Sequence, residues 1–88
     1  MKAHFDANGD VIVITGGANG IGRALAGAVA AAGARVIVFD RDQGAMESLV
    51  RETPSVSARL LDVSDLAAVM EAFAAIEKEY GGIDGLVC

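Results

Sequence analysis

A glycine-rich run from Thr15 to Gly22 lies between a β-branched stretch and an alanine-rich one. The β-branched stretch, residues 11–14, is typical of a strand, and the alanine-rich stretch, residues 23–32, is typical of a helix. Glycine permits positive φ and lets a ligand approach the backbone, and the free N–H groups at a helix start favour a pyrophosphate. The pattern therefore predicts a dinucleotide site; the alternative is a tight turn that uses glycine for packing alone.

A carboxylate follows at the spacing that such a site would use. Asp40 ends the apolar run 35–39, about 20 residues beyond the glycines. There an acidic side chain can accept hydrogen bonds from the adenosine ribose, and its charge repels a 2′-phosphate, although Arg41 would reduce the repulsion. The Asp40 carboxylate therefore predicts NAD in preference to NADP, and Asn19, in place of a basic residue within the glycine run, adds to this preference. The alternative for Asp40 is a residue that begins a turn.

Strand-like and helix-like blocks alternate along the chain. We expect strands at residues 11–15, 35–39, 57–61 and 83–88. We expect helices at residues 20–32 and 43–51, and a third helix that begins after Ser64, its N-cap, and ends before Gly81. Gly33 should follow the first helix with left-handed geometry, and Thr53-Pro54 should stop the second. This pattern predicts an α/β fold: part of a three-layer, doubly wound, Rossmann-like parallel sheet in the order 3-2-1-4.

In such sheets the ligand crevice lies beyond the carboxyl ends of the strands, where the strand order reverses. The glycine run, Asp40 and Asp62 all follow strands, so we expect them at one edge of the sheet. Asp62 taken alone fits equally well as a turn or helix-start residue.

The expected helices have apolar faces that should pack on the sheet. For the second helix these residues are Met46, Leu49 and Val50, and for the third they are Leu66, Val69, Met70, Phe73 and Ile76. We interpret His4 and Tyr80 as surface or packing residues rather than acid-base groups.

Composition limits the classes of protein and partner. The 88 residues allow one domain, 1–88, and a net charge of −5 argues against nucleic acid. Cys88 is the single cysteine, so the sequence excludes an internal disulfide and a metal site of several thiolates. With neither a signal-peptide pattern nor a bilayer-spanning run, we expect a soluble, cytoplasmic chain with no membrane partner.

Three features resemble the short-chain dehydrogenase/reductases, and the resemblance covers nearly the whole chain. They are Thr15-Gly-x-x-x-Gly20-x-Gly22, Asp40 and Asp62-Val63. The glycine pattern departs from the Gly-x-Gly-x-x-Gly of other Rossmann dehydrogenases, since the third glycine is absent. We predict a cofactor-binding set of Gly16, Asn19, Gly20, Ile21, Gly22, Asp40, Arg41, Asp62 and Val63; the resemblance implies all of these except Gly22, which belongs to the glycine run, and Arg41, which lies beside Asp40. By the same resemblance, the glycine run would bind the pyrophosphate, Asp40 the adenosine ribose, and Asp62 with Val63 the adenine.

The resemblance also implies an NAD-dependent oxidoreductase that transfers a hydride between the nicotinamide and a small alcohol or ketone. The family's catalytic serine, its Tyr-x-x-x-Lys pair and its assisting asparagine would lie beyond Cys88. Tyr80 is followed by Gly81-Gly82-Ile83-Asp84 and does not fit that motif, so we assign no catalytic residue. We expect the N-terminal, cofactor-binding part of a longer enzyme, inactive by itself because a general acid is missing.

A second interpretation is a non-catalytic half-Rossmann module that binds a nucleotide or associates with itself. If nothing follows the fourth strand, its residues Ile83, Leu86 and Val87 would be partly uncovered, and an exposed apolar sheet edge invites pairing with another chain. Under either interpretation we expect a homo-oligomer.

Overall fold

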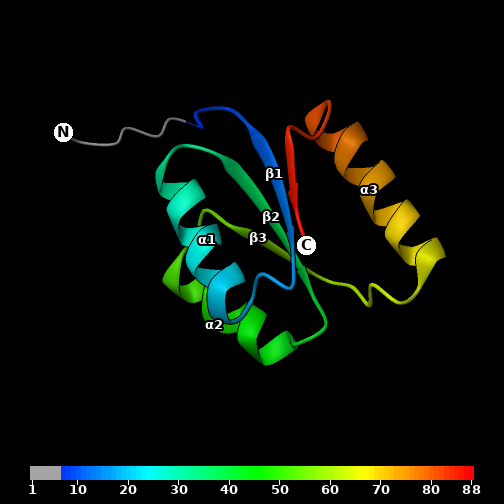
Figure 1. The fold of residues 1–88 in the computed structure, drawn as a ribbon, viewed down its shortest axis with the longest axis horizontal. Helices are drawn as coiled ribbons and strands as arrows, with labels where there is room; N and C mark the ends of the chain where they lie inside the picture. The colour runs from blue at the N-terminus through cyan, green and yellow to red at the C-terminus, as the bar shows by residue number, and fades with distance from the viewer. Residues whose placement is uncertain (1–6) are drawn as a thin grey trace.

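The structure is a computed structural model that describes residues 7–88. Within these residues strands and helices alternate as β1 (Val11–Thr15), α1 (Gly20–Ala31), β2 (Arg35–Asp40), α2 (Gln43–Glu52), β3 (Ser57–Leu60), α3 (Leu66–Tyr80) and β4 (Gly85–Val87). The strands form one sheet in the order β3-β2-β1-β4, with every neighbouring pair parallel. This order confirms the predicted topology (Figure 1).

The register of the central strands decides where the strand ends meet. β1 and β2 pair from Val11↔Arg35 to Thr15↔Phe39, so the residues that follow both strands emerge side by side. Asp40, the last residue of β2, pairs with Leu60 of β3. The carboxyl ends of β1, β2 and β3 therefore lie at one edge of the sheet (Figure 1).

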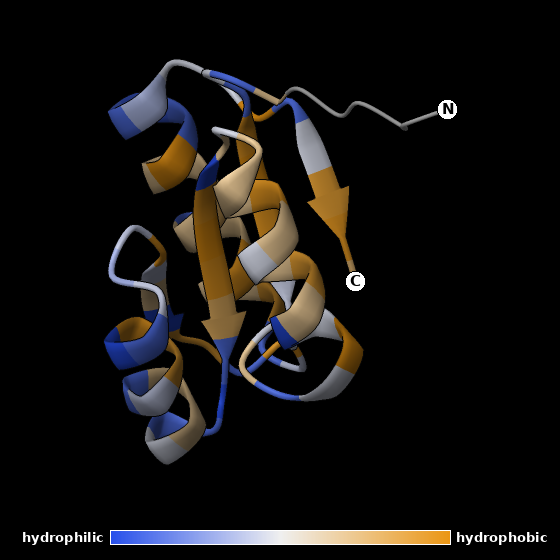
Figure 2. Cartoon of the chain, turned by 90° about the vertical axis from the view of Figure 1, so that its left-hand side faces the viewer, coloured by the Kyte–Doolittle hydropathy of each residue, from blue (hydrophilic) through white to orange (hydrophobic). Residues whose placement is uncertain are grey.

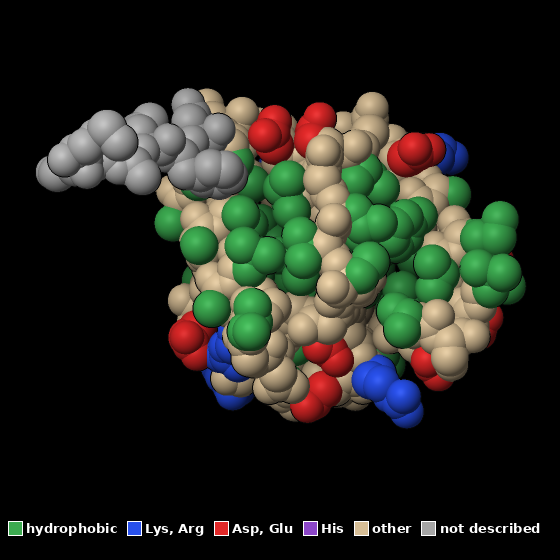
Figure 3. Space-filling view, viewed as in Figure 1, with side chains coloured by type: hydrophobic (Ala, Val, Ile, Leu, Met, Phe, Trp, Pro, Cys, Tyr) green, Lys and Arg blue, Asp and Glu red, His purple; other side chains and the backbone are tan. Residues whose placement is uncertain are grey.

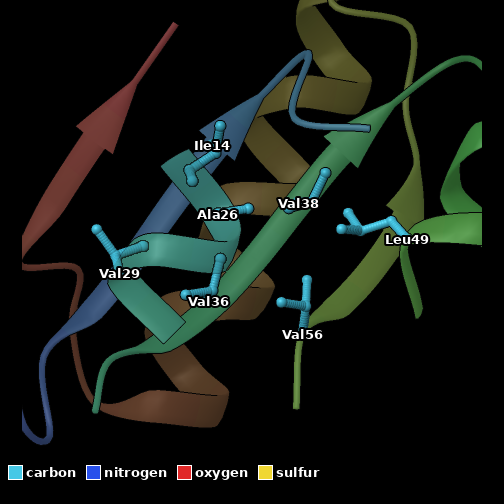
Figure 4. Packing of buried hydrophobic residues seen from close by; sticks show 7 residues of the cluster. All are labelled: Ile14, Ala26, Val29, Val36, Val38, Leu49 and Val56. Carbon is cyan, nitrogen blue, oxygen red and sulfur yellow. The ribbon is translucent and has the colours of Figure 1, made fainter. Parts of the chain in front are cut away.

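Helices cover both faces of the sheet and give it three layers (Figure 1). α1 and α2 lie on one face, where their side chains meet alternate residues of β1 and β2 (Figure 4). The buried residues of this cluster are Ile14, Ala26, Val29, Val36, Val38, Leu49 and Val56. Because successive strand residues point to opposite faces, β1 and β2 supply both sides of the core.

α3 covers the other face of the sheet. The buried residues on that side are Val11, Val13, Ile37, Phe39, Leu61 and Ile76. The rings of Phe39 and Phe73 stack with centroids 6.0 Å apart, which fixes α3 against β2. In Figure 2 the hydrophobic colour is strongest on the strands, whereas the hydrophilic colour lies mainly on helices and connecting loops.

The helix ends follow local sequence signals in most places. Gly33, just past α1, has φ 98°, and α2 ends at Glu52, before Thr53-Pro54, both as predicted. The predicted N-cap of α3, Ser64, is wrong: Asp65 is the cap, and its carboxylate accepts from the N–H of Ala68 at 3.1 Å. Ser64 instead donates its hydroxyl and its N–H to Asp62.

Three side chains that we expected in the core are exposed: Val50 of α2, and Leu66 and Met70 of α3. Leu66 is 70% exposed and Met70 is 65% exposed. The face of α3 that meets the sheet includes Ala68 and Ala72, whose small side chains allow close approach. Met70, which its hydrophobicity predicted to be buried, therefore lies outside the buried face of α3.

Several elements end one or two residues from their predicted limits, and β4 differs most. β4 covers Gly85–Val87, whereas residues 83–88 were expected. Ile83 packs with the cluster under α3, and Asp84 fixes the start of β1. The Asp84 carboxylate accepts from the N–H of Val11 at 2.8 Å, and the N–H of Asp84 donates to the Val11 carbonyl at 2.8 Å.

His4 lies outside the described residues. Tyr80 is half-buried and packs against the cluster under α3, in agreement with a packing role. Among residues 7–88, no helix is long and apolar enough to cross a membrane.

Candidate cofactor-binding site

The glycines between β1 and α1 differ in what surrounds them. Gly16 and Gly20 have φ of 72° and 58°, and a Cβ on either would meet nothing within 4 Å. Their backbone therefore faces open space and is accessible to a ligand. Gly22 differs, because a Cβ there would lie 2.6 Å from the carbonyl oxygen of Gly16. Its missing side chain lets the first turn of α1 pack directly on the loop.

Hydrogen bonds attach this loop to the end of β2. The N–H of Gly16 donates to the Phe39 carbonyl at 2.7 Å. The N–H of Ala18 donates to Oδ2 of Asp40 at 3.1 Å. The carboxylate that was predicted to bind the ribose therefore lies directly against the glycine loop.

A second carboxylate, Asp42, extends this contact. Its backbone N–H donates to Oδ1 of Asp40 at 3.1 Å, and its Oδ2 accepts from the side-chain amide of Asn19 at 3.2 Å. Its Oδ1 also accepts from the N–H of Ala45 at 3.0 Å and caps α2. Asp42 thus joins the glycine loop, the end of β2 and the start of α2.

Arg23, in the first turns of α1, links the loop to α2 at a second place. Its guanidinium donates to the Ala18 carbonyl at 3.4 Å and to the Ser48 hydroxyl at 3.0 Å, and it forms an ion pair with Glu52. Because these bonds attach α2 to the carbonyl side of Ala18 while Asp40 binds its N–H, both sides of this loop residue are fixed.

A hollow of about 190 Å³ opens beside Asp40 at the carboxyl ends of β2 and β3. Its lining residues are Gly16, Phe39, Asp40, Arg41, Leu61, Asp62, Val63 and Ser64. Oδ1 of Asp62 accepts from the Ser64 hydroxyl at 2.7 Å and from the Ser64 N–H at 2.9 Å. These bonds fix the carboxylate and leave its Oδ2 without a hydrogen-bond partner among the described residues.

Two large apolar side chains stand exposed around the site. Ile21, at the start of α1, is 88% exposed, and Val63, at the hollow, is 60% exposed. Exposed hydrophobic side chains beside open backbone and carboxylates are suited to covering by a ligand with an apolar face.

Two site carboxylates have lowered pKa values. The N–H of Ala45 and the Asn19 amide lower the pKa of Asp42 below its ordinary 3.8. The hydroxyl and N–H of Ser64 lower the pKa of Asp62, and the charge of Arg41 adds to this effect.

These shifts predict a pH dependence of stability. Because each pKa is lowered in the folded chain, both carboxylates stabilise the fold above their ordinary value of 3.8. That stabilisation is lost as pH falls through the lowered folded pKa. Urea denaturation at neutral pH and at successively lower pH should show that the free energy of unfolding decreases less on acidification in Asp62→Asn than in the parent chain. An equal decrease in the variant and in the parent chain would contradict the prediction.

The structure places the nine predicted site residues in two adjoining groups. Gly16, Asp40, Arg41, Asp62 and Val63 line one hollow, and Asn19, Gly20, Ile21 and Gly22 lie at the adjoining start of α1. Their contact with a cofactor stays a prediction. Sequence reasoning missed Asp42, Ser64 and Arg23. The Asp-x-Asp spacing before a helix is a signal for Asp42 as an N-cap, but nothing local indicates its bond to Asn19.

A glycine loop and carboxylates at the carboxyl edge of a parallel sheet define the first half of a Rossmann-type fold. The family model described as short chain dehydrogenase matches residues 10–88. The chain therefore belongs to the short-chain dehydrogenase family.

Individual relatives agree with this assignment. The chain is 46% identical over 81 residues to galactitol 2-dehydrogenase of Agrobacterium fabrum, covering 91% of this chain and 32% of the relative. It is 40% identical over 75 residues to L-xylulose reductase of Bos taurus, covering 85% of this chain and 29% of the relative. The solved structure of a 3-ketoacyl-(acyl-carrier-protein) reductase from Brucella melitensis, complexed with NADH, superimposes with a TM-score of 0.82 at 33% identity. The match covers 92% of this chain and 34% of the reductase. The chain thus spans about a third of the length of the curated relatives it matches.

Proposed function

We propose that this chain is the NAD-binding part of a short-chain dehydrogenase that transfers a hydride between nicotinamide and an alcohol or ketone. The observation that carries the proposal is the open backbone at Gly16 and Gly20 beside the Asp40 carboxylate, which is itself bonded to the loop. A pyrophosphate needs open backbone N–H groups, and a ribose diol needs a carboxylate that accepts its hydrogen bonds.

The described residues fit a dinucleotide. The open glycine backbone and the start of α1 would hold the pyrophosphate, with Ile21 beside it. Asp40 would accept from the adenosine ribose hydroxyls, and the hollow with Asp62 and Val63 would take the adenine. The bound cofactor supplies the redox chemistry, while these residues bind and orient it.

The names of the relatives support a substrate class for the whole enzyme. Galactitol is a sugar alcohol and L-xylulose is a ketose. We therefore propose that the whole enzyme interconverts a polyol and a ketose. No residue among the 88 is assigned to proton transfer, and the chain alone is expected to bind cofactor without turning over substrate.

Calorimetric titration with NAD and, separately, with NADP tests the cofactor proposal. We expect saturable binding that favours NAD, with a Kd of about 1 mM, or about −4 kcal/mol. Absence of NAD binding would show that these residues do not form a cofactor site by themselves, and a preference for NADP would reject the assignment of Asp40.

A second candidate function, self-association, is favoured by the surface around β4. Leu86 and Val87 are exposed, and Figure 3 shows hydrophobic side chains on both sides of this strand. Among the described residues β4 pairs only with β1, and an unpaired strand edge of this kind can accept a strand from a second copy of the chain.

Sedimentation velocity over a wide concentration range tests this candidate. We expect the average mass to rise with concentration, and Leu86→Asp to reduce the rise because it places a charge in the apolar edge. Leu60→Asp, on the opposite edge strand β3, is the matched control because Leu60 is also exposed. A monomer at every concentration would contradict self-association.

We also propose a cytoplasmic location. The single cysteine, Cys88, is exposed and has no second cysteine in this chain with which to pair. A reducing compartment keeps such a thiol free. Labelling of Cys88 in intact cells by permeant and impermeant thiol reagents would test this location.

A further inference from the structure

We infer that Asp42 is a specificity-determining positioning residue, which orients the Asn19 amide so that the glycine loop favours a ribose hydroxyl over a 2′-phosphate. The inference rests on the proposed function, since it concerns the same NAD site. Its starting point is that one oxygen of Asp42 caps α2 while the other reaches the loop, 23 residues away along the chain.

The contact fixes which way the Asn19 amide points. A carboxylate only accepts hydrogen bonds, so the NH₂ group of Asn19 must face Oδ2 of Asp42, as it does at 3.2 Å. The carbonyl oxygen of the same amide lies on the other branch and is left as an acceptor. An acceptor suits a ribose hydroxyl, which can donate, and repels a phosphate, which at neutral pH mainly accepts.

Asp42 also closes a ring of hydrogen bonds. Ala18 donates to Asp40, Asp42 donates to Asp40, and Asn19 donates to Asp42. Two successive loop residues are thereby attached to the two carboxylates that follow β2. The amide of Asn19 consequently has one preferred orientation, and through Asp42 it is connected to Asp40, the residue predicted to bind the ribose.

A simple helix cap in the same chain shows what is distinctive about Asp42. Asp65 caps α3 with the same backbone angles, φ −92° and ψ 95°, and accepts from the N–H of Ala68 at 3.1 Å. The described hydrogen bonds of Asp65 stay within residues 62–69 and do not reach the glycine loop. Asp65 is therefore a matched control for the capping role alone.

The test compares Asp42→Asn with Asp65→Asn in NAD and NADP titrations of this chain. Asparagine retains the cap in both variants, because its side-chain oxygen can still accept from the helix N–H. Asp42→Asn removes the acceptor-only group that fixes the Asn19 amide. We expect the ratio of the NADP Kd to the NAD Kd to fall about fivefold in Asp42→Asn, and to change less than about twofold in Asp65→Asn.

The double variant Asn19→Ala/Asp42→Asn shows whether Asp42 acts through Asn19. If it does, Asp42→Asn changes the ratio little once Asn19 is alanine; an equal change in both backgrounds would mean that Asp42 acts by its own charge and would overturn the inference. NMR gives a readout independent of the cofactor: the side-chain amide resonances of Asn19 should shift as Asp42 titrates and not in Asp42→Asn.

The wild-type titration separates the two levels of failure. NAD binding with a ratio unchanged in Asp42→Asn would overturn the role of Asp42 and leave the cofactor site intact. If NAD does not bind the wild-type chain, the proposed function fails, and the role of Asp42 fails with it.

Discussion

Gly22→Ala should destabilise the fold by about 3 kcal/mol or more, out of the roughly 5–10 kcal/mol expected for a domain of this size. A Cβ at this position would lie 2.6 Å from the Gly16 carbonyl oxygen and 3.0 Å from Cα of Gly17. Both atoms belong to the backbone, so no side-chain rotation can relieve the contact. Urea denaturation followed by circular dichroism would measure the loss, and the displaced loop should also lose its affinity for NAD.

Gly27→Ala is the control for this prediction. Gly27 lies in the interior of α1, and a Cβ there would meet nothing within 4 Å. Alanine favours a helix over glycine, so this variant should be more stable by about 1 kcal/mol. Equal stability of the two variants would show that Gly22 is not closely packed against the glycine loop.

The sheet order and the elements were predictable because their signals are local and repeated. β1 and β2 are apolar runs, and each is followed by a residue type that ends a strand or begins a loop. Alternation with helices then restricts the topology, because crossovers between parallel strands are right-handed. The same reasoning placed the glycine loop, Asp40 and Asp62 at one edge, and the hollow beside Asp40 confirms their proximity.

Burial and caps were less predictable because they depend on how closely elements approach one another. Met70 has the hydrophobicity of a core residue, but the face of α3 that packs on the sheet carries Ala68, Ala72 and Ile76, and Met70 is exposed. Ser64 and Asp65 are both good N-cap residues, and Asp62 decides between them by binding Ser64. None of these outcomes has a periodic signal in the sequence.

The contact between Asn19 and Asp42 shows the same limit within the site. Each residue alone is a helix-start residue, and their meeting depends on the register that places the end of β2 beside the glycine loop. Sequence spacing indicates that both lie at the carboxyl edge of the sheet, but it does not indicate which side chains bond there.

Asp40→Ala should weaken NAD binding by about 10- to 100-fold, because hydrogen bonds to a charged carboxylate are among the stronger polar contacts in proteins. NADP binding should weaken less, since the carboxylate repels its 2′-phosphate and removing the charge relieves that repulsion. Calorimetric titration of both cofactors would give the two affinities. Glu71→Ala, which removes one exposed negative charge on α3, is the control for net charge.

The ratio of the two affinities separates a direct role of Asp40 from a structural one. Its Oδ2 accepts from Ala18 and its Oδ1 from Asp42, so removing the carboxylate also loosens the glycine loop. A loosened loop should weaken NAD and NADP alike, whereas loss of the ribose acceptor should weaken NAD more. An equal loss for both cofactors would therefore leave Asp40 as a structural residue, and unchanged affinities for both would reject either role.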